Sequence, residues 1–292
     1  MLAFVAAEAR EFSGLLRKAE RTSKLDWPVD FARRVWLNGR AAVLVANGPG
    51  PKLAGEAVEI AKGREELTGL VSTGFCGALD PALKALDIFV ATEILPSHHD
   101  CVLPNRDREG VTMGLRPTKI DEDAEWFNSW QAETPAPPCS TNVGQAFPLA
   151  NSGKKERVFN GALLHTLACA RGSVRGGSLL SIDRVASTVA EKHELYATTG
   201  AAAIEMEAAA VAQKAKEYNL PFYCIRVVTD TATESFPLDF NRMRDDSGRF
   251  SRTKIIAAAL RRPSVFPKLI ELNKRCKLAA EALGDFIADT RF

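Results

Sequence analysis

The chain has 292 residues, of which 46% are hydrophobic and 25% are charged, and its formal net charge is +2 at pH 7. These values are typical of a globular enzyme-sized domain, and the small net charge argues against a nucleic-acid-binding protein. The six cysteines form no CxxC pair and favour a reducing cytoplasm. No uncharged apolar run is long enough to span a bilayer. We therefore expect a cytoplasmic protein with no nucleic-acid partner.

Strand and helix patterns alternate along the first third of the chain. The apolar stretch 2–7 predicts a buried strand, Glu8–Glu11 begins a loop or helix, and 12–18 has helical spacing. Further strands are expected at 34–37, 41–46, 67–73 and 87–94, and a helix is expected at 52–61. This order predicts a mixed α/β sheet.

A glycine-rich turn, Asn47-Gly-Pro-Gly50, connects the strand at 41–46 to the helix at 52–61. Such a turn suits an anion at a helix N-terminus, so Gly48 is a candidate phosphate contact. The turn matches neither a Walker loop nor GxGxxG. Nucleotide-phosphate binding through those motifs is therefore not expected.

Acids inside an apolar run mark the segment 202–230. Glu205 and Glu207 flank Met206 in a predicted helix at 202–211, and a buried strand at 222–228 follows, interrupted only by Arg226. A buried carboxylate needs a partner or ligand, because burying a bare charge is costly. Solvated first-turn acids beside a structural Arg226 would be an equally simple interpretation. Thr229 and Asp230 come at the strand's carboxyl end, where ligands bind in open α/β sheets.

Two stretches here, Ile204-Glu-Met-Glu-Ala-Ala-Ala and Pro221-Phe-Tyr-Cys-Ile-Arg-Val-Val-Thr-Asp, resemble the signature of the purine and uridine phosphorylase superfamily. Residues 72–88 are similar to the family's Gly-rich ribose/phosphate loop and the strand after it, and 177–185 resemble the strand that carries its base-contacting loop. The nearest branch is that of the methylthioadenosine/S-adenosylhomocysteine nucleosidases, with the hopanoid-associated nucleosidases also similar. The resemblance implies one domain over 1–292, built as a three-layer α/β/α sandwich with a mixed central sheet. It also implies a homo-oligomer, a small-molecule nucleoside substrate, no cofactor and no metal.

The resemblance also implies roles for individual residues. Asp230 would protonate the purine N7, Glu207 would hold the ribose hydroxyls, and Glu11 would orient the attacking water, with Glu8 as the alternative. Carboxylates suit this chemistry because the transition state is oxocarbenium-like. Arg226 would neutralise a nearby acid. The other substrate-binding candidates are Met206, Glu205, Thr229, Phe75, Gly74, Val185 and Ala186.

The Gly-rich segment bears on whether water or phosphate is the nucleophile. Phosphorolytic members carry an arginine and a serine there as phosphate ligands, and this chain has Ser72 and Phe75 at those positions. Two charge-assisted phosphate contacts are therefore missing, which favours hydrolysis. Arg10 favours the opposite, because a nearby loop arginine binds phosphate in phosphorolytic relatives.

The substrate prediction is a purine nucleoside of adenosine type, either methylthioadenosine/S-adenosylhomocysteine-like or a lipid-linked adenosine. Val185 stands where the family usually offers a stacking Phe. Phe75 and Val185 therefore keep a non-catalytic nucleoside-binding relative open beside the hydrolase and the phosphorylase.

The remaining segments carry less chemistry. Residues at about 103–156 fall outside the resemblance and are expected to be a surface insertion. His98-His99-Asp100 fits a polar loop better than a metal site, and His193 with Lys192 and Glu194 fits a solvated helix face. The segments 254–260 and 268–288 predict two amphipathic helices.

Overall fold

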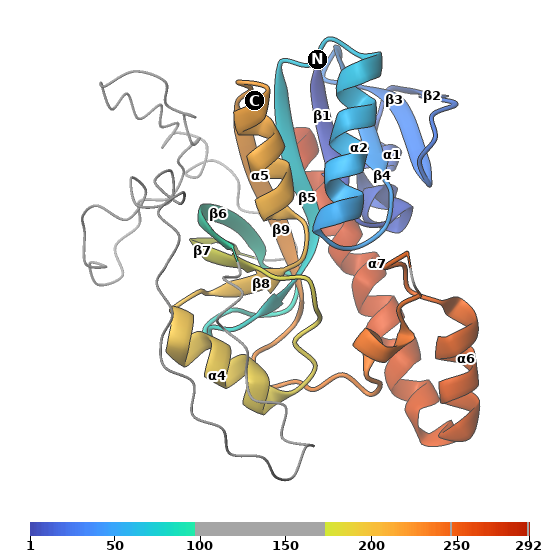
Figure 1. Cartoon of the computed structure of the whole chain (residues 1–292), viewed down its shortest axis with the longest axis vertical. Helices are drawn as coiled ribbons and strands as arrows, with labels where there is room; N and C mark the ends of the chain where they lie inside the picture. Colours follow the sequence, from blue (N-terminus) through green and yellow to red (C-terminus); the bar gives the residue numbers. More distant parts are fainter. Residues whose placement is uncertain (97–172, 246, 291) are drawn as a thin grey trace, which may run out of the picture. The chain divides into compact units, whose positions relative to one another are not determined.

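The computed structural model describes residues 1–96, 173–245, 247–290 and 292 (Figure 1). The expected insertion at about 103–156 and the segment His98–Asp100 lie outside these residues. No helix within the described part of the chain is both long and apolar enough to cross a membrane.

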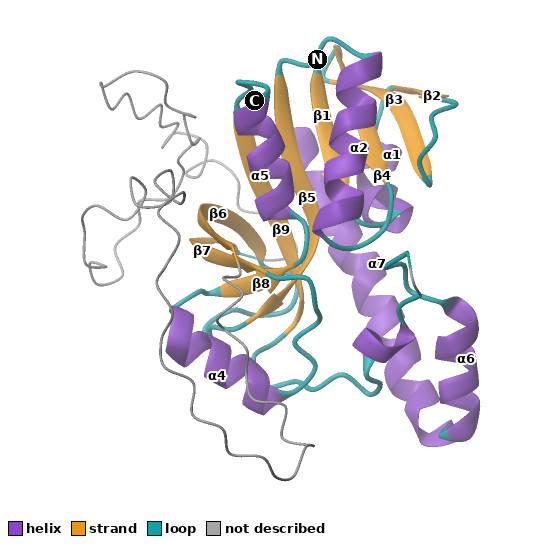
Figure 2. Cartoon of the chain, viewed as in Figure 1, coloured by secondary structure: helices purple, strands orange, loops and turns teal. Residues whose placement is uncertain are grey.

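The described strands form one mixed sheet with the order β2-β3-β4-β1-β5-β8-β7-β6-β9 (Figure 2). Their bounds are β1 Leu2–Ala6, β2 Arg21–Lys24, β3 Phe31–Leu37, β4 Arg40–Ala46, β5 Gly69–Ala78, β6 Ile88–Pro96, β7 Val174–Ser181, β8 Ala203–Glu205 and β9 Phe222–Asp230. β1 is parallel to both β4 and β5, whereas β3 is antiparallel to β2 and β4. The mixed sheet predicted from the sequence is confirmed.

Part of this sheet closes on itself. β5 pairs with β8 on one side and with β9 on the other, and β9 pairs in turn with β6. β7 completes the circuit because it pairs with both β6 and β8. The strands β5, β8, β7, β6 and β9 therefore form a ring of hydrogen-bonded neighbours.

The helices are short except for the last one. Their bounds are α1 Ser13–Lys18, α2 Pro51–Arg64, α4 Val189–Thr199, α5 Ala208–Glu217, α6 Arg252–Arg261 and α7 Phe266–Asp289. 3₁₀ turns span Ala9–Phe12, Phe240–Met243 and Pro263–Val265. The two C-terminal helices predicted from the amphipathic pattern are confirmed.

Alternate side chains of the strands enter two different cores. Ala3 and Val5 of β1 pack in the core that holds the buried faces of α2 and α5. Phe4 of the same strand packs in a second core with residues of α1 and α7. Successive strand side chains point to opposite faces, so helices cover both sides of the sheet (Figure 1). The predicted three-layer α/β/α arrangement is confirmed.

Two local predictions are wrong, and one strand has no counterpart among the predictions. The helix expected at 202–211 begins only at Ala208, because Ala203–Glu205 forms β8 between β7 and β5. Backbone pairing on both sides of this segment outweighs the helix propensity of its residues. The segment Gly74–Gly77, expected to be a loop, continues β5 with an irregular register after Cys76. The edge strand β2 was not expected, since all four of its residues are exposed and carry no apolar alternation.

The contact between α1 and α7 depends on two glycines. An added Cβ on Gly284 would lie 2.2 Å from the carbonyl carbon of Gly14, and one on Gly14 would lie 2.0 Å from the carbonyl oxygen of Ala280. Both neighbours are backbone atoms, so relief requires the helices to move apart.

We therefore predict that Gly284→Ala lowers the free energy of unfolding by about 1–3 kcal/mol through overpacking. Gly63→Ala is the matched control, since Gly63 is an exposed α2 residue with open space around its Cα. This control should stabilise by about 0.5–1 kcal/mol. Urea unfolding followed by circular dichroism measures both, and equal effects would contradict the close helix contact.

Candidate active site

A pocket of about 170 Å³ lies where several parallel strands end. It collects residues from the segments after β1, β4 and β7, from the ends of β5 and β9, and from the β8–α5 junction. Of the residues predicted from sequence, the following line it: Arg10, Glu11, Phe75, Val185, Ala186, Glu205, Met206, Glu207, Thr229 and Asp230. Glu8, the alternative to Glu11, lines it as well. Gly74, Arg226 and Gly48 are not part of the lining.

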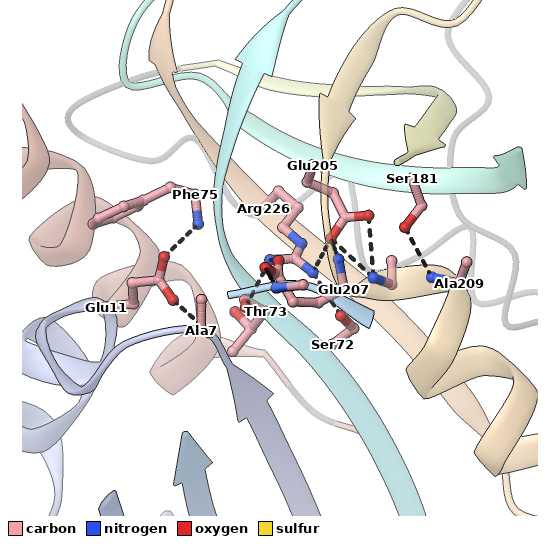
Figure 3. A network of polar contacts seen from close by, with 12 residues as sticks. Ala7, Glu11, Ser72, Thr73, Phe75, Ser181, Glu205, Glu207, Ala209 and Arg226 are labelled. Carbon is pink, nitrogen blue, oxygen red and sulfur yellow. Dashed lines mark hydrogen bonds and ion pairs between the residues drawn. The ribbon is translucent and has the colours of Figure 1, made fainter. Parts of the chain in front are cut away.

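Glu11 is held in the pocket wall by backbone donors (Figure 3). Its Oε2 accepts hydrogen bonds from the N–H groups of Ala7 (2.9 Å) and Glu8 (3.2 Å), and its Oε1 accepts from the N–H of Phe75 (3.4 Å). Burial raises the pKa of Glu11, and the neighbouring Glu8 adds to this. The result is a carboxylate of fixed orientation, with a proton affinity above the ordinary value.

Gly74 provides the space behind Glu11. A Cβ at this position would lie 2.8 Å from Glu11 Oε2 and 3.1 Å from Arg226 Nη1, and its φ of +129° is a conformation that other residues rarely adopt. Gly74 does not line the pocket, but its missing side chain leaves room for Glu11 and Arg226 to approach each other.

Arg226 is completely buried in the middle of β9 and forms the centre of a polar network (Figure 3). Nη2 lies 2.5 Å from Glu205 Oε2 and donates to Ser72 Oγ at 2.7 Å. Nη1 donates to the carbonyl of Thr73 at 2.9 Å and lies 3.4 Å from Glu207 Oε2. A buried arginine is tolerated because carboxylates and hydrogen-bond acceptors surround it.

Glu205 and Glu207 have different surroundings. Glu205 accepts from the N–H groups of Glu207 (2.8 Å) and Ala208 (2.9 Å), so it caps the first turn of α5. Glu207 Oε1 accepts from the N–H of Gly50 at 3.0 Å, and its other oxygen faces Arg226. Burial, reinforced by the charge of Glu205, raises the pKa of Glu207 to about 8. The interpretation of these acids as solvated first-turn residues is excluded, since both are buried.

Asp230, the last residue of β9, is bonded at both carboxylate oxygens. Oδ2 accepts from Lys192 Nζ at 2.5 Å, and Oδ1 accepts from Thr229 Oγ1 at 2.9 Å. Burial raises the pKa of Asp230, whereas the ammonium of Lys192 and the Thr229 hydroxyl oppose that rise. Gly77 makes room for this carboxylate, because a Cβ there would lie 2.8 Å from Oδ2.

The placement of Lys192 corrects the prediction of a solvated face on α4. His193 and Glu194 are exposed as expected, but Lys192 is completely buried. Lys192 lies on the same side of the helix as the buried Leu195, three residues later. This helical spacing is the sequence signal that could have identified Lys192.

The remaining lining is largely apolar and aromatic. The guanidinium carbon of Arg10 lies over the Phe75 ring, 5.9 Å from the ring centre. Arg10 Nε also pairs with Glu8 Oε2 at 2.6 Å. Val185 exchanges two hydrogen bonds with the side-chain amide of Asn241, through its N–H (2.8 Å) and its carbonyl (2.9 Å). Sequence reasoning missed these further lining residues: Ala7, Pro49, Cys76, Gly77, Arg184, Ile204, Phe236 and Phe250.

The glycine-rich turn after β4 uses its amides internally. The N–H of Gly48 donates to the carbonyl of Ala7 at 2.9 Å, and that of Gly50 donates to Glu207. Pro49 has no N–H to offer. The turn therefore positions Glu207 instead of presenting free amides to an anion. Within the described segments, no group of three or more His, Cys, Asp or Glu side chains is placed to hold a metal ion.

A family model described as the phosphorylase superfamily matches residues 28–256, which is most of the chain. The chain belongs to the phosphorylase superfamily. The resemblance noted in its motifs is thereby confirmed.

Curated relatives and solved structures agree with this placement in the phosphorylase superfamily. The 5′-methylthioadenosine/S-adenosylhomocysteine nucleosidase of Bacillus cytotoxicus is 26% identical over 223 residues, which cover 75% of this chain and 81% of the relative. The Neisseria meningitidis nucleosidase of the same name, solved with methylthio-immucillin-A, is similar with a TM-score of 0.57 and 21% identity over 98% of this chain and 96% of its own. The Colwellia psychrerythraea nucleosidase, solved with adenine, has a TM-score of 0.55 and 23% identity over 82% and 86%. These structural likenesses show a shared fold.

We predict that Arg226→Met destabilises the folded protein strongly. The substitution leaves Glu205 and Glu207 buried without their cation, and losing one partner of a buried ion pair costs about 3–5 kcal/mol. Arg242→Met is the matched control, since the Arg242 side chain is 80% exposed and, among the described residues, forms an ion pair with Asp239 three residues earlier. Chemical unfolding measures both variants, and a small effect of Arg226→Met would contradict the central role of this network.

Proposed function

We propose that the protein is a nucleosidase that hydrolyses the N-glycosidic bond of an adenosine-type nucleoside and releases the free base and a ribosyl product. The observation that carries this proposal is the presence of three buried carboxylates, Glu11, Glu207 and Asp230, in one pocket of a phosphorylase-superfamily chain. The nucleosidase names of its relatives and the adenine bound by the Colwellia structure support an adenine-type base.

Bond cleavage begins at Asp230 in this mechanism. The C–N bond breaks with its electron pair going to the purine, while the Asp230 carboxyl group delivers its proton to N7. Burial favours the protonated form of Asp230 and so prepares it as a general acid. The base leaves as a neutral molecule, and Asp230 is left as a carboxylate that regains a proton from solvent.

Glu207 and Glu11 act on the sugar. Glu207 accepts hydrogen bonds from the ribose hydroxyls between Gly50 N–H and Arg226. In its ionised form, which predominates above its pKa of about 8, it also stabilises the developing oxocarbenium ion by charge. Met206 packs beside the ribose. Glu11 orients a water molecule toward the anomeric carbon and takes its proton as the C–O bond forms. Glu11 then releases this proton to solvent.

Water is favoured over phosphate as the nucleophile. Ser72 Oγ is occupied by Arg226, Phe75 presents a benzyl group to the pocket, and the Gly48 amide is bonded to Ala7. Phosphate binding requires charge-assisted donors, and none of these three groups offers one. Phosphorolysis is the second candidate because Arg10, about half exposed, lines the pocket.

A single domain over 1–292, a homo-oligomeric assembly and a cytoplasmic location complete the proposal. Static light scattering of the purified full chain tests the assembly.

We predict that the purified protein releases adenine from adenosine, methylthioadenosine or S-adenosylhomocysteine without added phosphate. Chromatography of the free base after incubation with and without phosphate makes the measurement. A strict phosphate requirement, with a ribose 1-phosphate product, would replace hydrolysis by phosphorolysis. Adenine binding in a thermal-shift assay without any base release would favour a non-catalytic binding protein.

We also predict that Asp230→Asn, Glu207→Gln and Glu11→Gln each lower kcat by about 10²–10⁴-fold, as expected for acid–base and electrostatic residues. Glu59→Gln is the matched control, because the Glu59 side chain is 51% exposed on α2 and does not line the pocket. Circular dichroism checks that each variant is folded. Full turnover in the Asp230 and Glu207 variants would remove these assignments.

A further inference from the structure

Lys192 is a buried cation that the chemistry proposed above does not use. It lies in the second turn of α4, the helix that follows the pocket-lining segment Arg184–Ala186. Its side chain is completely excluded from solvent. A lysine is almost never fully buried unless it is paired, so the group that pairs with Lys192 indicates its structural role.

The partner is the carboxylate at the end of β9. Lys192 Nζ donates to Asp230 Oδ2 at 2.5 Å and to the carbonyl of Thr231 at 2.8 Å, and it lies 5.5 Å from the ring centre of Phe236. Phe236 is itself fixed to the segment before α4, because its N–H donates to the carbonyl of Ser187 at 2.9 Å. The ammonium thus joins α4, the end of β9 and the loop after it.

We propose that Lys192 is a positioning residue that fixes the Asp230 carboxyl group and stabilises the carboxylate left when Asp230 gives its proton to the departing base. This proposal rests on the proposed nucleosidase function. With Oδ2 bonded to Lys192 and Oδ1 to Thr229, the carboxyl group is held in one orientation. In this step only the Asp230 proton moves.

Other groups also act on Asp230. Glu234, in the loop after β9, raises the pKa of Asp230, but it is itself paired with Arg275 of α7 at 2.7 Å. The charge of Asp230 also acts on the thiols of Cys76 in β5 and Cys276 in α7, and burial, the larger cause, raises the pKa of both. These thiols are therefore neutral near pH 7, and Lys192 is the cation in direct contact with Asp230.

The direction of the expected pH effect follows from these charges. A general acid is active while protonated, so kcat/KM falls as the pH rises through the pKa of Asp230 in the free enzyme. The Lys192 ammonium lowers the pKa of Asp230 against the effect of burial. Removing that ammonium raises the pKa further, and the alkaline limb of the profile moves to higher pH.

The test compares the full-length wild type with Lys192→Met and Lys192→Arg in base release from the best nucleoside, measured from pH 5 to 10. We expect Lys192→Met to lower kcat by about 10- to 100-fold, the loss of one charge-assisted hydrogen bond, and to move the alkaline limb upward. Lys192→Arg should restore the limb toward its wild-type position. Lys24→Met, an exposed β2 lysine outside the pocket, should leave the profile unchanged.

A double-mutant cycle separates this role from a merely structural one. If Lys192 acts through Asp230, Lys192→Met adds no further loss of kcat in an Asp230→Asn background. An unmoved alkaline limb, or fully additive losses, would overturn the positioning role while leaving the nucleosidase in place. Where Lys192→Met fails to fold by circular dichroism, Lys192→Gln, which also removes the positive charge, replaces it in the pH profile and in the cycle, with the same deciding outcomes. A wild type that releases no base overturns both proposals.

Discussion

The arrangement of the site depends on one buried ion pair, that between Arg226 and Glu205. Arg226 comes from β9 and Glu205 from β8, and the same guanidinium reaches Ser72 and Thr73 in β5. Glu205 in turn caps α5 at the residue after Glu207. A single desolvated cation therefore sets where three strands meet, where α5 begins and where Glu207 lies. Such a pair is weak evidence for stability, but it fixes one geometry.

Within that geometry, each carboxylate accepts hydrogen bonds from a different set of donors. Glu205 accepts from the first turn of α5, Glu11 from backbone amides, and Asp230 from Lys192 and Thr229. Burial raises the pKa of Glu11, Glu207 and Asp230 alike. Three acids in one pocket can hold different protonation states because different neighbours compensate each of them. This is the property that acid–base cleavage of a glycosidic bond requires.

Much of this could be predicted from sequence, because apolar runs and the spacing around 202–230 record the burial pattern. The mixed sheet, the C-terminal helices and the acids at 205, 207 and 230 follow from such local signals, whereas Glu11 was predicted only through the family resemblance. The ring closure of β5 onto β9 does not, since it depends on pairing between segments about 150 residues apart. Lys192 was assigned to a solvated face because its neighbours His193 and Glu194 are polar, and its partner Asp230 lies 38 residues away. β8 was misassigned because helix-forming residues are recruited into a sheet by partners on both sides.

The ring formed by β5, β8, β7, β6 and β9 has a consequence for how such a protein diversifies. Phe75 and Gly77, Glu205, and Asp230 lie on β5, β8 and β9, which are mutually linked members of this ring. No one of these strands can tilt or slide without breaking ladder bonds to a neighbour, so the pocket-lining residues on them keep a fixed mutual arrangement. The connecting segments 184–186 and 231–245 lie outside these ladders. New specificities would then arise by exchanging such connections while the ring of strands is retained.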